Sequence, residues 1–221
     1  MLKLFLGYDP REAIGFHVCV ESILRHASQP IEIIPIRGDQ RDGTNAFTYA
    51  RFLVPHLCEY KGGAVFIDGS DMLLREDIVP LAGYACDTSK AVHVVQHHYR
   101  TKHPRKYVGT AMEADNRDYP RKNWSSVMVF NCGHAKNRAM HPDSVRELPG
   151  AALHQFKWLR QDEIGELPFK WNVLIGEDGE DKECAIAHFT LGIPAFPHYM
   201  KCRYADEWFD AAKAMTNEVP Q

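Results

Sequence analysis

The first 67 residues alternate between short apolar runs and longer amphipathic segments, and this alternation constrains the fold more than any other feature. The run "LKLFLGY" is typical of a buried strand that ends at Gly7. "PIEIIPI" (Pro30 to Ile36) predicts a second strand, placed near a sheet edge by Pro35, and Ala64 to Ile67 predicts a third. The order strand, helix, strand, helix, strand indicates a mostly parallel α/β sheet with crossover helices.

The intervening segments carry helix signals. Asp9 as N-cap and Glu12 in a capping-box position predict a helix from about Arg11 to His26. The segment Ala46 to Tyr60 predicts a second helix, kinked at Pro55.

Three later runs predict further strands, and no linker divides the chain. They are Ala91 to Gln96, Ser125 to Asn131 and Cys184 to Phe189. With no Pro/Gly/Ser-rich boundary, we expect residues 1–221 to form a single domain.

Composition excludes several classes of protein. A net charge of −3 argues against a dedicated nucleic-acid binder, which is usually strongly basic. No run approaches the roughly 18 apolar residues of a membrane span, and charge appears before a signal-peptide core could form. These features predict a cytoplasmic protein. The six cysteines are scattered singly, which favours free buried thiols, with disulfides as the alternative.

Two acids directly follow the third strand, in "VFIDGSDMLL". Ligands of open α/β sheets bind beyond the carboxyl ends of the strands. Asp68 and Asp71 lie at such an end, and paired carboxylates repel unless a cation or proton lies between them. Mg²⁺ and Mn²⁺ prefer such oxygen ligands, and Ser70 offers a hydroxyl as well. The alternative is a turn, since Asp, Gly and Ser are common turn residues.

A series of motifs occurs in a specific order along the chain. These are "FLGYDPREAIGFHVCVESILRHA", "YARFLVPHL", "VFIDGSDMLL", "SSVMVFNCG", "LPFKWNVL" and "IAHFTLGIP". Together they resemble a family 8-type glycosyltransferase of the GT-A fold, from Leu4 to about Phe196. The resemblance implies a Rossmann-like, mostly parallel sheet flanked by helices.

The resemblance also implies a metal and a donor. Asp68 and Asp71 take the place of an Asp-x-Asp motif that holds Mn²⁺ or Mg²⁺ against the diphosphate of a nucleotide sugar, usually UDP-linked. His188, in the late "HFT" segment, takes the place of a third metal ligand. The spacing "DGSD" is one residue longer than in the family, which leaves open which of Asp68, Ser70 and Asp71 bind the ion.

The resemblance places the nucleoside at the first strand-to-helix turn. Gly7, Tyr8 and Asp9 occupy that turn, with Tyr8 able to stack on a base. Asp9 has two competing roles, as helix cap or as ligand contact. Arg51 corresponds to an arginine that reaches the donor phosphate or sugar, the alternative being a solvated helical arginine.

Two residues are expected beside the donor sugar. Asn131 belongs to a segment that in the family usually contains Phe-Asn-Ala/Ser-Gly. Gln155 lies where the family often has Asp-Gln-Asp, but its neighbours here are His154 and Phe156. The loss of both acids weakens any role for a carboxylate nucleophile.

The family's lysine shortly after the late histidine is missing here. We expect Lys201 to replace it as the diphosphate-binding cation, with Arg203 or the Arg121-Lys122 pair as alternatives, because a leaving diphosphate needs a cation. The segment from His98 to Lys122 is expected to form a mobile loop over the site.

These features predict a metal-dependent glycosyltransferase. It would transfer a sugar from a nucleotide-diphosphate donor to a carbohydrate or other hydroxyl acceptor, with retention through same-face attack. One alternative is a non-catalytic nucleotide-sugar-binding protein. A second is a nucleotidyltransferase, which normally has a Gly-rich phosphate loop where this chain has "GYDPRE".

Overall fold

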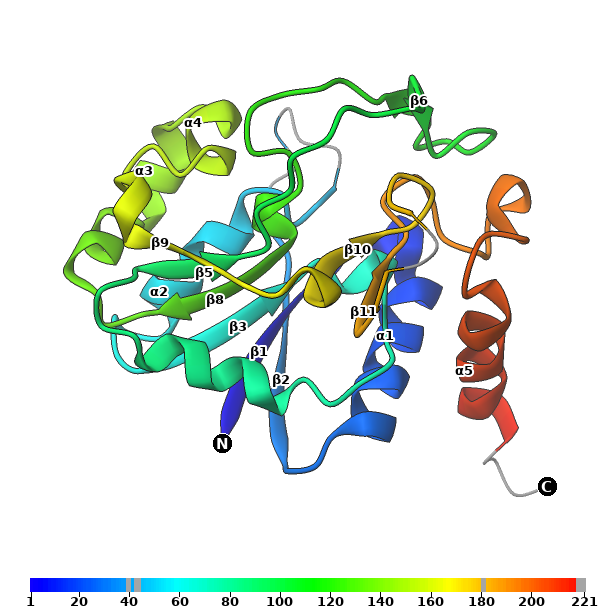
Figure 1. Ribbon diagram of the computed structural model, residues 1–221, viewed down its shortest axis with the longest axis horizontal. Helices are drawn as coiled ribbons and strands as arrows, with labels where there is room; N and C mark the ends of the chain where they lie inside the picture. The colour runs from blue at the N-terminus through cyan, green and yellow to red at the C-terminus, as the bar shows by residue number, and fades with distance from the viewer. Residues whose placement is uncertain (39–40, 42–44, 180–181, 218–221) are drawn as a thin grey trace.

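The computed structural model describes residues 1–38, 41, 45–179 and 182–217. The strands are β1 (Leu2–Gly7), β2 (Ile31–Ile36), β3 (Gly63–Ile67), β4 (Met72–Leu74), β5 (Val92–Val94), β6 (Arg105–Lys106), β7 (Ala114–Asp115), β8 (Val127–Asn131), β9 (Ile164–Glu166), β10 (Val173–Leu174) and β11 (Ile186–His188). The α-helices are α1 (Ala13–His26), α2 (Val54–Leu57), α3 (Pro142–Glu147), α4 (Gly150–His154) and α5 (Ala205–Asn217) (Figure 1).

A six-stranded sheet of order β2-β1-β3-β8-β5-β9 forms the centre of the molecule. The pairs β1–β2, β1–β3 and β5–β9 are parallel, whereas β8 runs antiparallel to both β3 and β5. This architecture confirms the predicted α/β class, and β2 lies at the sheet edge as Pro35 indicated. The carboxyl ends of β1 and β3 and the amino end of β8 therefore meet at one edge.

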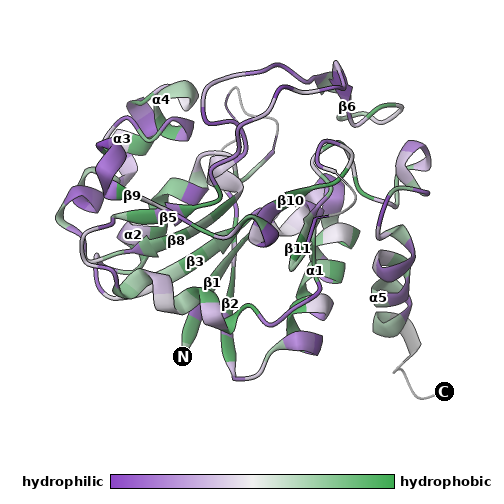
Figure 2. Ribbon diagram, viewed as in Figure 1, coloured by the Kyte–Doolittle hydropathy of each residue, from purple (hydrophilic) through white to green (hydrophobic). Residues whose placement is uncertain are grey.

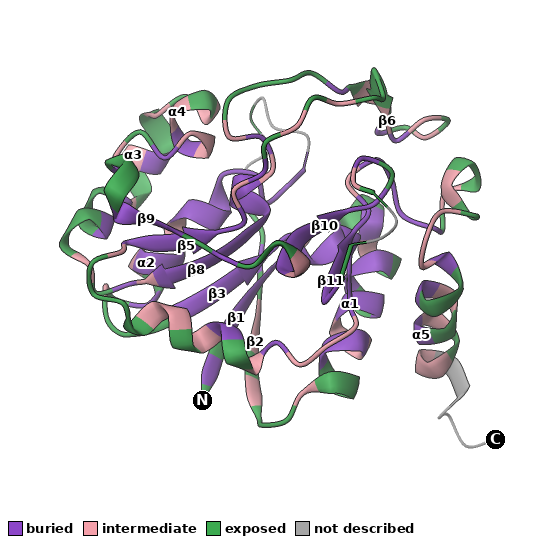
Figure 3. Cartoon of the chain, in the orientation of Figure 1, coloured by how far each residue is buried: buried purple, intermediate pink, exposed green. Residues whose placement is uncertain are grey.

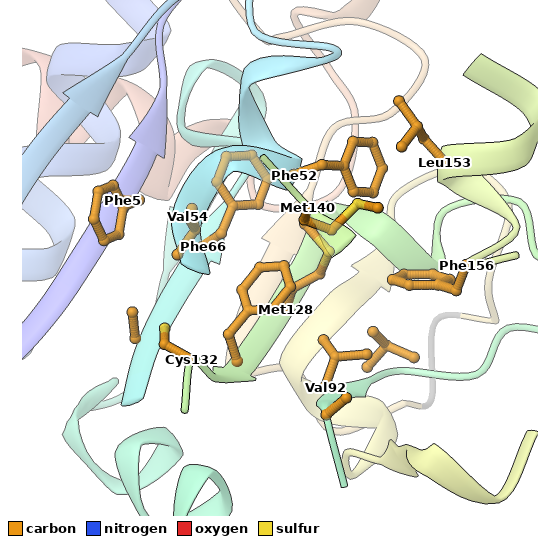
Figure 4. Packing of buried hydrophobic residues seen from close by; sticks show 14 of the residues in the cluster. Phe5, Phe52, Val54, Phe66, Val92, Met128, Cys132, Met140, Leu153 and Phe156 are labelled. Atoms are coloured by element: carbon orange, nitrogen blue, oxygen red, sulfur yellow. The ribbon is translucent and has the colours of Figure 1, made fainter. Parts of the chain in front are cut away.

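Alternate residues of the central strands enter two separate cores, as the period of a strand requires. One face carries Phe66 and Met128, which pack under Phe52, Leu153 and Phe156 from the segments around α2 and α4 (Figure 4). The other face packs against α1 and the segment Val79–Cys86. Both faces are thus covered, and Figures 2 and 3 show the central strands as apolar and buried.

A small sheet of order β10-β11-β4 lies beside the main one. Its pairing of β11 with β4 is antiparallel and sets His188 opposite Met72. Val18 of α1 and Trp208 of α5 pack with this sheet in a third core. The small sheet therefore carries residues near the C-terminus back to the end of β3.

The predicted second helix is shorter than expected. The segment contains a 3₁₀ helix, η2 (Ala50–Leu53), followed by the single turn α2. Pro55 lies at the start of α2, where its missing N–H is tolerated, whereas a proline inside a continuous helix is not. The first helix agrees with its prediction, since the 3₁₀ turn η1 (Pro10–Glu12) leads directly into α1.

All six cysteines are free, which agrees with the prediction of thiols, although Cys86 is exposed rather than buried. Within the described residues, no helix is both long enough and apolar enough to cross a bilayer.

Candidate functional site: an acidic cluster beneath a basic arm

A 3₁₀ turn brings the two predicted acids together. Strand β3 ends at Ile67, and η3 (Gly69–Asp71) follows before β4 begins. The amide of Asp71 donates to the carbonyl of Asp68 across this turn (3.2 Å). The turn accommodates the extra residue in "DGSD", so both carboxylates face the same side.

Ser70 anchors this turn to the first strand. Its hydroxyl donates to the carbonyl of Gly7 (3.3 Å) and accepts from the amide of Asp9 (3.2 Å), and the side chain is fully buried. The hydroxyl is thus engaged with the backbone of the first strand-to-helix turn.

Asp68, Asp71 and His188 form a buried cluster. Their ligand atoms lie within 4.8 Å of one another, and each residue is at most 7% exposed. Nε2 of His188 lies 3.3 Å from Oδ2 of Asp71, while Oδ1 of Asp71 is buried with no hydrogen-bond partner among the described residues.

Asn172 fixes the tautomer of His188. The amide nitrogen of Asn172 donates to the carbonyl of Asn123 (3.1 Å), so its oxygen faces Nδ1 of His188 (2.9 Å). Because an amide oxygen can only accept, Nδ1 carries a hydrogen, and in the neutral imidazole Nε2 presents a lone pair toward Asp71. Two acceptors at 3.3 Å need a cation or a second proton between them. Two carboxylates and an imidazole suit Mn²⁺, so the residues present fit a divalent ion.

Arg51 supports this cluster from η2. Its Nη1 lies 2.6 Å from Oδ1 of Asp68 and also donates to the carbonyl of Ser125 (2.9 Å). Burial raises the pKa of Asp68 to about 6; Arg51 opposes this rise, and the neighbouring Asp71 adds to it. Arg51 is therefore a buried partner of an acid, and it is not a solvated helical arginine.

A two-part cavity opens above the cluster. The inner part, about 90 Å³, contains Asp68, Asp71 and His188, and the outer part, about 380 Å³, contains Gln155. Both parts are lined by Thr48, Lys106, Tyr119, Asn123, His154 and Thr190. The six shared residues place the two parts side by side, with the acids in the inner one.

The segment from His98 to Lys122, here called the arm, covers this cavity. It carries the β6–β7 hairpin and extends from the sheet toward the C-terminal segments (Figure 1). The buried carboxylate of Glu177 accepts hydrogen bonds from Thr101, from the amide of Lys102 and from the side chain of Asn116. The segment therefore lies over the cavity as expected, and it is held there by a buried glutamate; its mobility stays a prediction.

Two lysines of the arm face the cavity. Lys106 lines both of its parts and Lys122 the outer part, where Nζ of Lys122 donates to Asn116 (2.7 Å). Burial lowers the pKa of both ammonium groups, while Asp71 pulls the pKa of Lys106 upward. The arm thus adds two lysines to the positive charge that Arg51 supplies at the inner end of the cavity.

The first turn does not line either part of this cavity within the described residues. Tyr8 packs edge-on against Phe16, with ring centroids 5.1 Å apart, and Gly7 approaches Phe47 so closely that a Cβ would lie 2.4 Å from its ring. Asp9 is the N-cap of η1 and accepts from the amide of Arg11 (2.9 Å), and its second oxygen accepts from Ala46 (2.9 Å). Of its two competing roles, the structure shows the cap.

Two sequence-predicted residues lie away from the cluster. Asn131 is paired with Gly63 at the opposite end of β3, because β8 runs antiparallel; this placement corrects the expectation that it lies beside the donor. The residues that precede β8, Asn123 and Ser126 among them, line the cavity instead. Lys201 lines a separate cavity of about 530 Å³, which corrects its expected place beside the acids.

Sequence reasoning missed Asn172, Lys106 and His154. Asn172 belongs to "LPFKWNVL", a motif that contributed to the resemblance without a role for its asparagine. Lys106 lies in the segment that was expected only to form a loop over the site, and His154 was noted only as a departure from the family's pattern. Nδ1 of His154 lies 2.7 Å from Oγ of Ser125, which positions its ring in the cavity wall.

Solved structures with the same fold are glycosyltransferases. The bifunctional glycosyltransferase WbbM gives a TM-score of 0.60 at 17% identity over 99% of this chain, which spans half of that protein. The galactosyltransferase LgtC, solved with donor and acceptor sugar analogues, gives 0.58 at 14% identity over 100% of this chain and 98% of its own. GlyE of Streptococcus pneumoniae gives 0.60 at 12% identity over 96% of this chain and 61% of its own. The likeness confirms the GT-A fold that the motifs predicted.

No family model matches the sequence. Protein CDI of Arabidopsis thaliana is 38% identical over 233 residues, covering 98% of this chain and 88% of that protein. Identity of this extent over nearly both whole chains means that the chain belongs to the same family as Protein CDI.

Proposed function

We propose that this protein transfers a sugar from a nucleotide-diphosphate donor, UDP-linked, to an acceptor hydroxyl, in a reaction that depends on Mn²⁺ or Mg²⁺ and retains the anomeric configuration. The buried Asp68–Asp71–His188 cluster at the inner end of a polar cavity carries the proposal. Its oxygen and nitrogen ligands suit an ion that also binds diphosphate. When bound, this ion would supply Lewis-acid stabilisation of the leaving diphosphate.

The arm supplies the remaining charge. Lys106, where the inner and outer cavities meet, is placed to bind diphosphate oxygens, and Lys122 lies further out. Gln155 and Asn123 line the space left for the sugar. These side chains orient the donor and neutralise the charge that develops as it departs.

The carboxylates that line the cavity are all engaged elsewhere, and this favours same-face attack over a carboxylate nucleophile. Of the described lining residues, Asp68 and Asp71 belong to the cluster, and Asp115 pairs with Arg105 and Arg117. None is therefore poised as a nucleophile. The bond between the anomeric carbon and the diphosphate oxygen breaks as the acceptor oxygen bonds to that carbon from the same face. The acceptor's proton passes to the departing phosphate oxygen.

A thermal-shift panel tests this function. UDP-, GDP- and CMP-sugars are compared with and without Mn²⁺, and we expect UDP-sugars alone to stabilise the protein, and only with the ion. A ligand at 100 times its Kd adds about 2.7 kcal/mol, or roughly 5–10 °C for a chain of this size. Equal stabilisation by all three nucleotides without metal would refute the proposal. Release of UDP from the donor then separates a transferase from a protein that only binds it.

A further inference from the structure

Glu12 is a buried acid for which the proposed reaction has no use so far. It ends η1, is 0% exposed, and neither carboxylate oxygen has a hydrogen-bond partner among the described residues. The capping box predicted for it does not form, because Asp9 caps η1 and the side chain of Glu12 caps nothing. Helix formation therefore does not account for this carboxyl group.

Helix α1, which begins directly after Glu12, packs against η3, the turn that carries Asp71. The first turn of α1 packs on η3 so tightly that a Cβ on Gly15 would lie 2.1 Å from the carbonyl oxygen of Ser70. Asp71 is the charged group that acts most strongly on Glu12, ahead of Asp9 and of the cations Lys106 and Arg11. Burial, with help from both aspartates, raises the pKa of Glu12 well above its usual range.

The neighbouring cations do not neutralise this acid. Arg11 donates from Nε and Nη2 to the two oxygens of Asp9 (2.9 and 2.6 Å), so its guanidinium is directed there. Both oxygens of Asp9 accept hydrogen bonds, whereas Glu12 and Oδ1 of Asp71 have no partner in the part of the chain that the structure describes. Burying a carboxyl group without a hydrogen-bond partner is costly, and leucine in its place would avoid that cost.

We propose that Glu12 is a fourth acidic residue of the cation site, supporting the ion from behind Asp71 through its negative charge and through water. The inference rests on the proposed function, because it assigns a role toward the same ion. Glu12 lies outside the group of ligand atoms within 4.8 Å, so it acts as a positioning residue. A cation held by Asp71 would offset the repulsion between Asp71 and Glu12.

Titration with Mn²⁺ alone, followed by calorimetry, tests this role. We expect Glu12→Gln to weaken Mn²⁺ binding about 10- to 100-fold, the usual effect of losing an outer partner of a metal site. Without metal, we expect its Tm to be equal to or above that of the wild type, because Glu12 makes no hydrogen bond to the described residues that the change could remove. Glu12→Met, of similar length, carries the same expectation and serves if the glutamine variant does not fold.

Glu163→Gln is the matched control. Glu163 is also buried, 6% exposed, but its carboxylate accepts from the amide of Arg160 (2.8 Å) in the 3₁₀ turn directly before β9. We expect this control to lose stability and to keep its Mn²⁺ affinity. Native Mn²⁺ affinity with a lowered Tm in Glu12→Gln would overturn the inference and mark a purely structural acid.

The variant Asp71→Ala distinguishes failure of the inference about Glu12 from failure of the proposed function. If Asp71→Ala loses Mn²⁺ binding while Glu12→Gln retains it, only the role of Glu12 is overturned. If the wild-type protein itself binds no Mn²⁺, the metal-dependent function and the inference fall together.

Discussion

Replacing Lys106 by methionine tests how this chain replaces the missing lysine after His188. Lys106 lines both parts of the cavity and lies in the field of Asp71, Glu12 and Asp68. A hydrogen bond from a charged group contributes about 1.5–3 kcal/mol. At about 1.4 kcal/mol per tenfold change, Lys106→Met should therefore raise the Kd for UDP with Mn²⁺ about 10- to 150-fold.

The same variant should have the opposite effect on the affinity for Mn²⁺ in the absence of nucleotide. Removing a cation beside the acids leaves more uncompensated negative charge, so Mn²⁺ without nucleotide should bind Lys106→Met at least as tightly as the wild type. Isothermal titration with Mn²⁺, and then with UDP at saturating Mn²⁺, measures both effects in one sample. A general folding defect would weaken both, so the opposite signs are diagnostic.

Lys201→Met is the control, since Lys201 was the cation expected from the sequence. It lies in the separate cavity with Tyr199 and Leu191, and we expect its UDP affinity to stay within about twofold of the wild type. If Lys201→Met weakens UDP binding while Lys106→Met does not, the assignment of the diphosphate cation to the arm is wrong.

Three further predictions concern the acidic cluster. Asp71→Ala should abolish metal-dependent turnover; near-native turnover in a donor-transfer assay would contradict the scheme. Asn172→Leu removes the acceptor that fixes the tautomer of His188, so the Kd for Mn²⁺ measured by calorimetry should rise about 10- to 100-fold. The pKa of Asp68 is raised to about 6, and protons compete with the ion below that value, so Mn²⁺ affinity should fall at least about tenfold between pH 7 and pH 5; a flat profile would contradict this.

The parts of the fold that depend on local signals could be predicted from the sequence. Apolar runs and helix-start residues located β1, α1 and β3, because strand periodicity and capping act over a few residues. The position of the two acids at the end of a strand could be predicted in the same way, because they directly follow an apolar run. The length of the second helix was not, because Pro55 is compatible with either a kink or a helix start.

The placement of Asn131 could not be predicted, because the direction of a strand within a sheet is set by its partners. The run "SSVMVFN" has the same apolar pattern whether β8 runs parallel or antiparallel to β3. In the antiparallel arrangement, its first residues face the acids and its last residue lies at the far edge. The strand itself was predicted correctly, but its carboxyl end, with Asn131, was expected at the site where the structure has its amino end.

The loss of the lysine after His188 and the basic composition of the arm have one structural explanation. The segment that follows His188 is bonded to both sides of the site: the amide of Phe189 donates to the carbonyl of Asp71 (2.8 Å), and the carbonyl of Leu191 accepts from Tyr107 (2.6 Å). This segment therefore holds the arm in place, and the arm brings Lys106 to the acids. Because the arm is held at Leu191 and again at Glu177, residues far from the acids in sequence should control how well the donor diphosphate is bound.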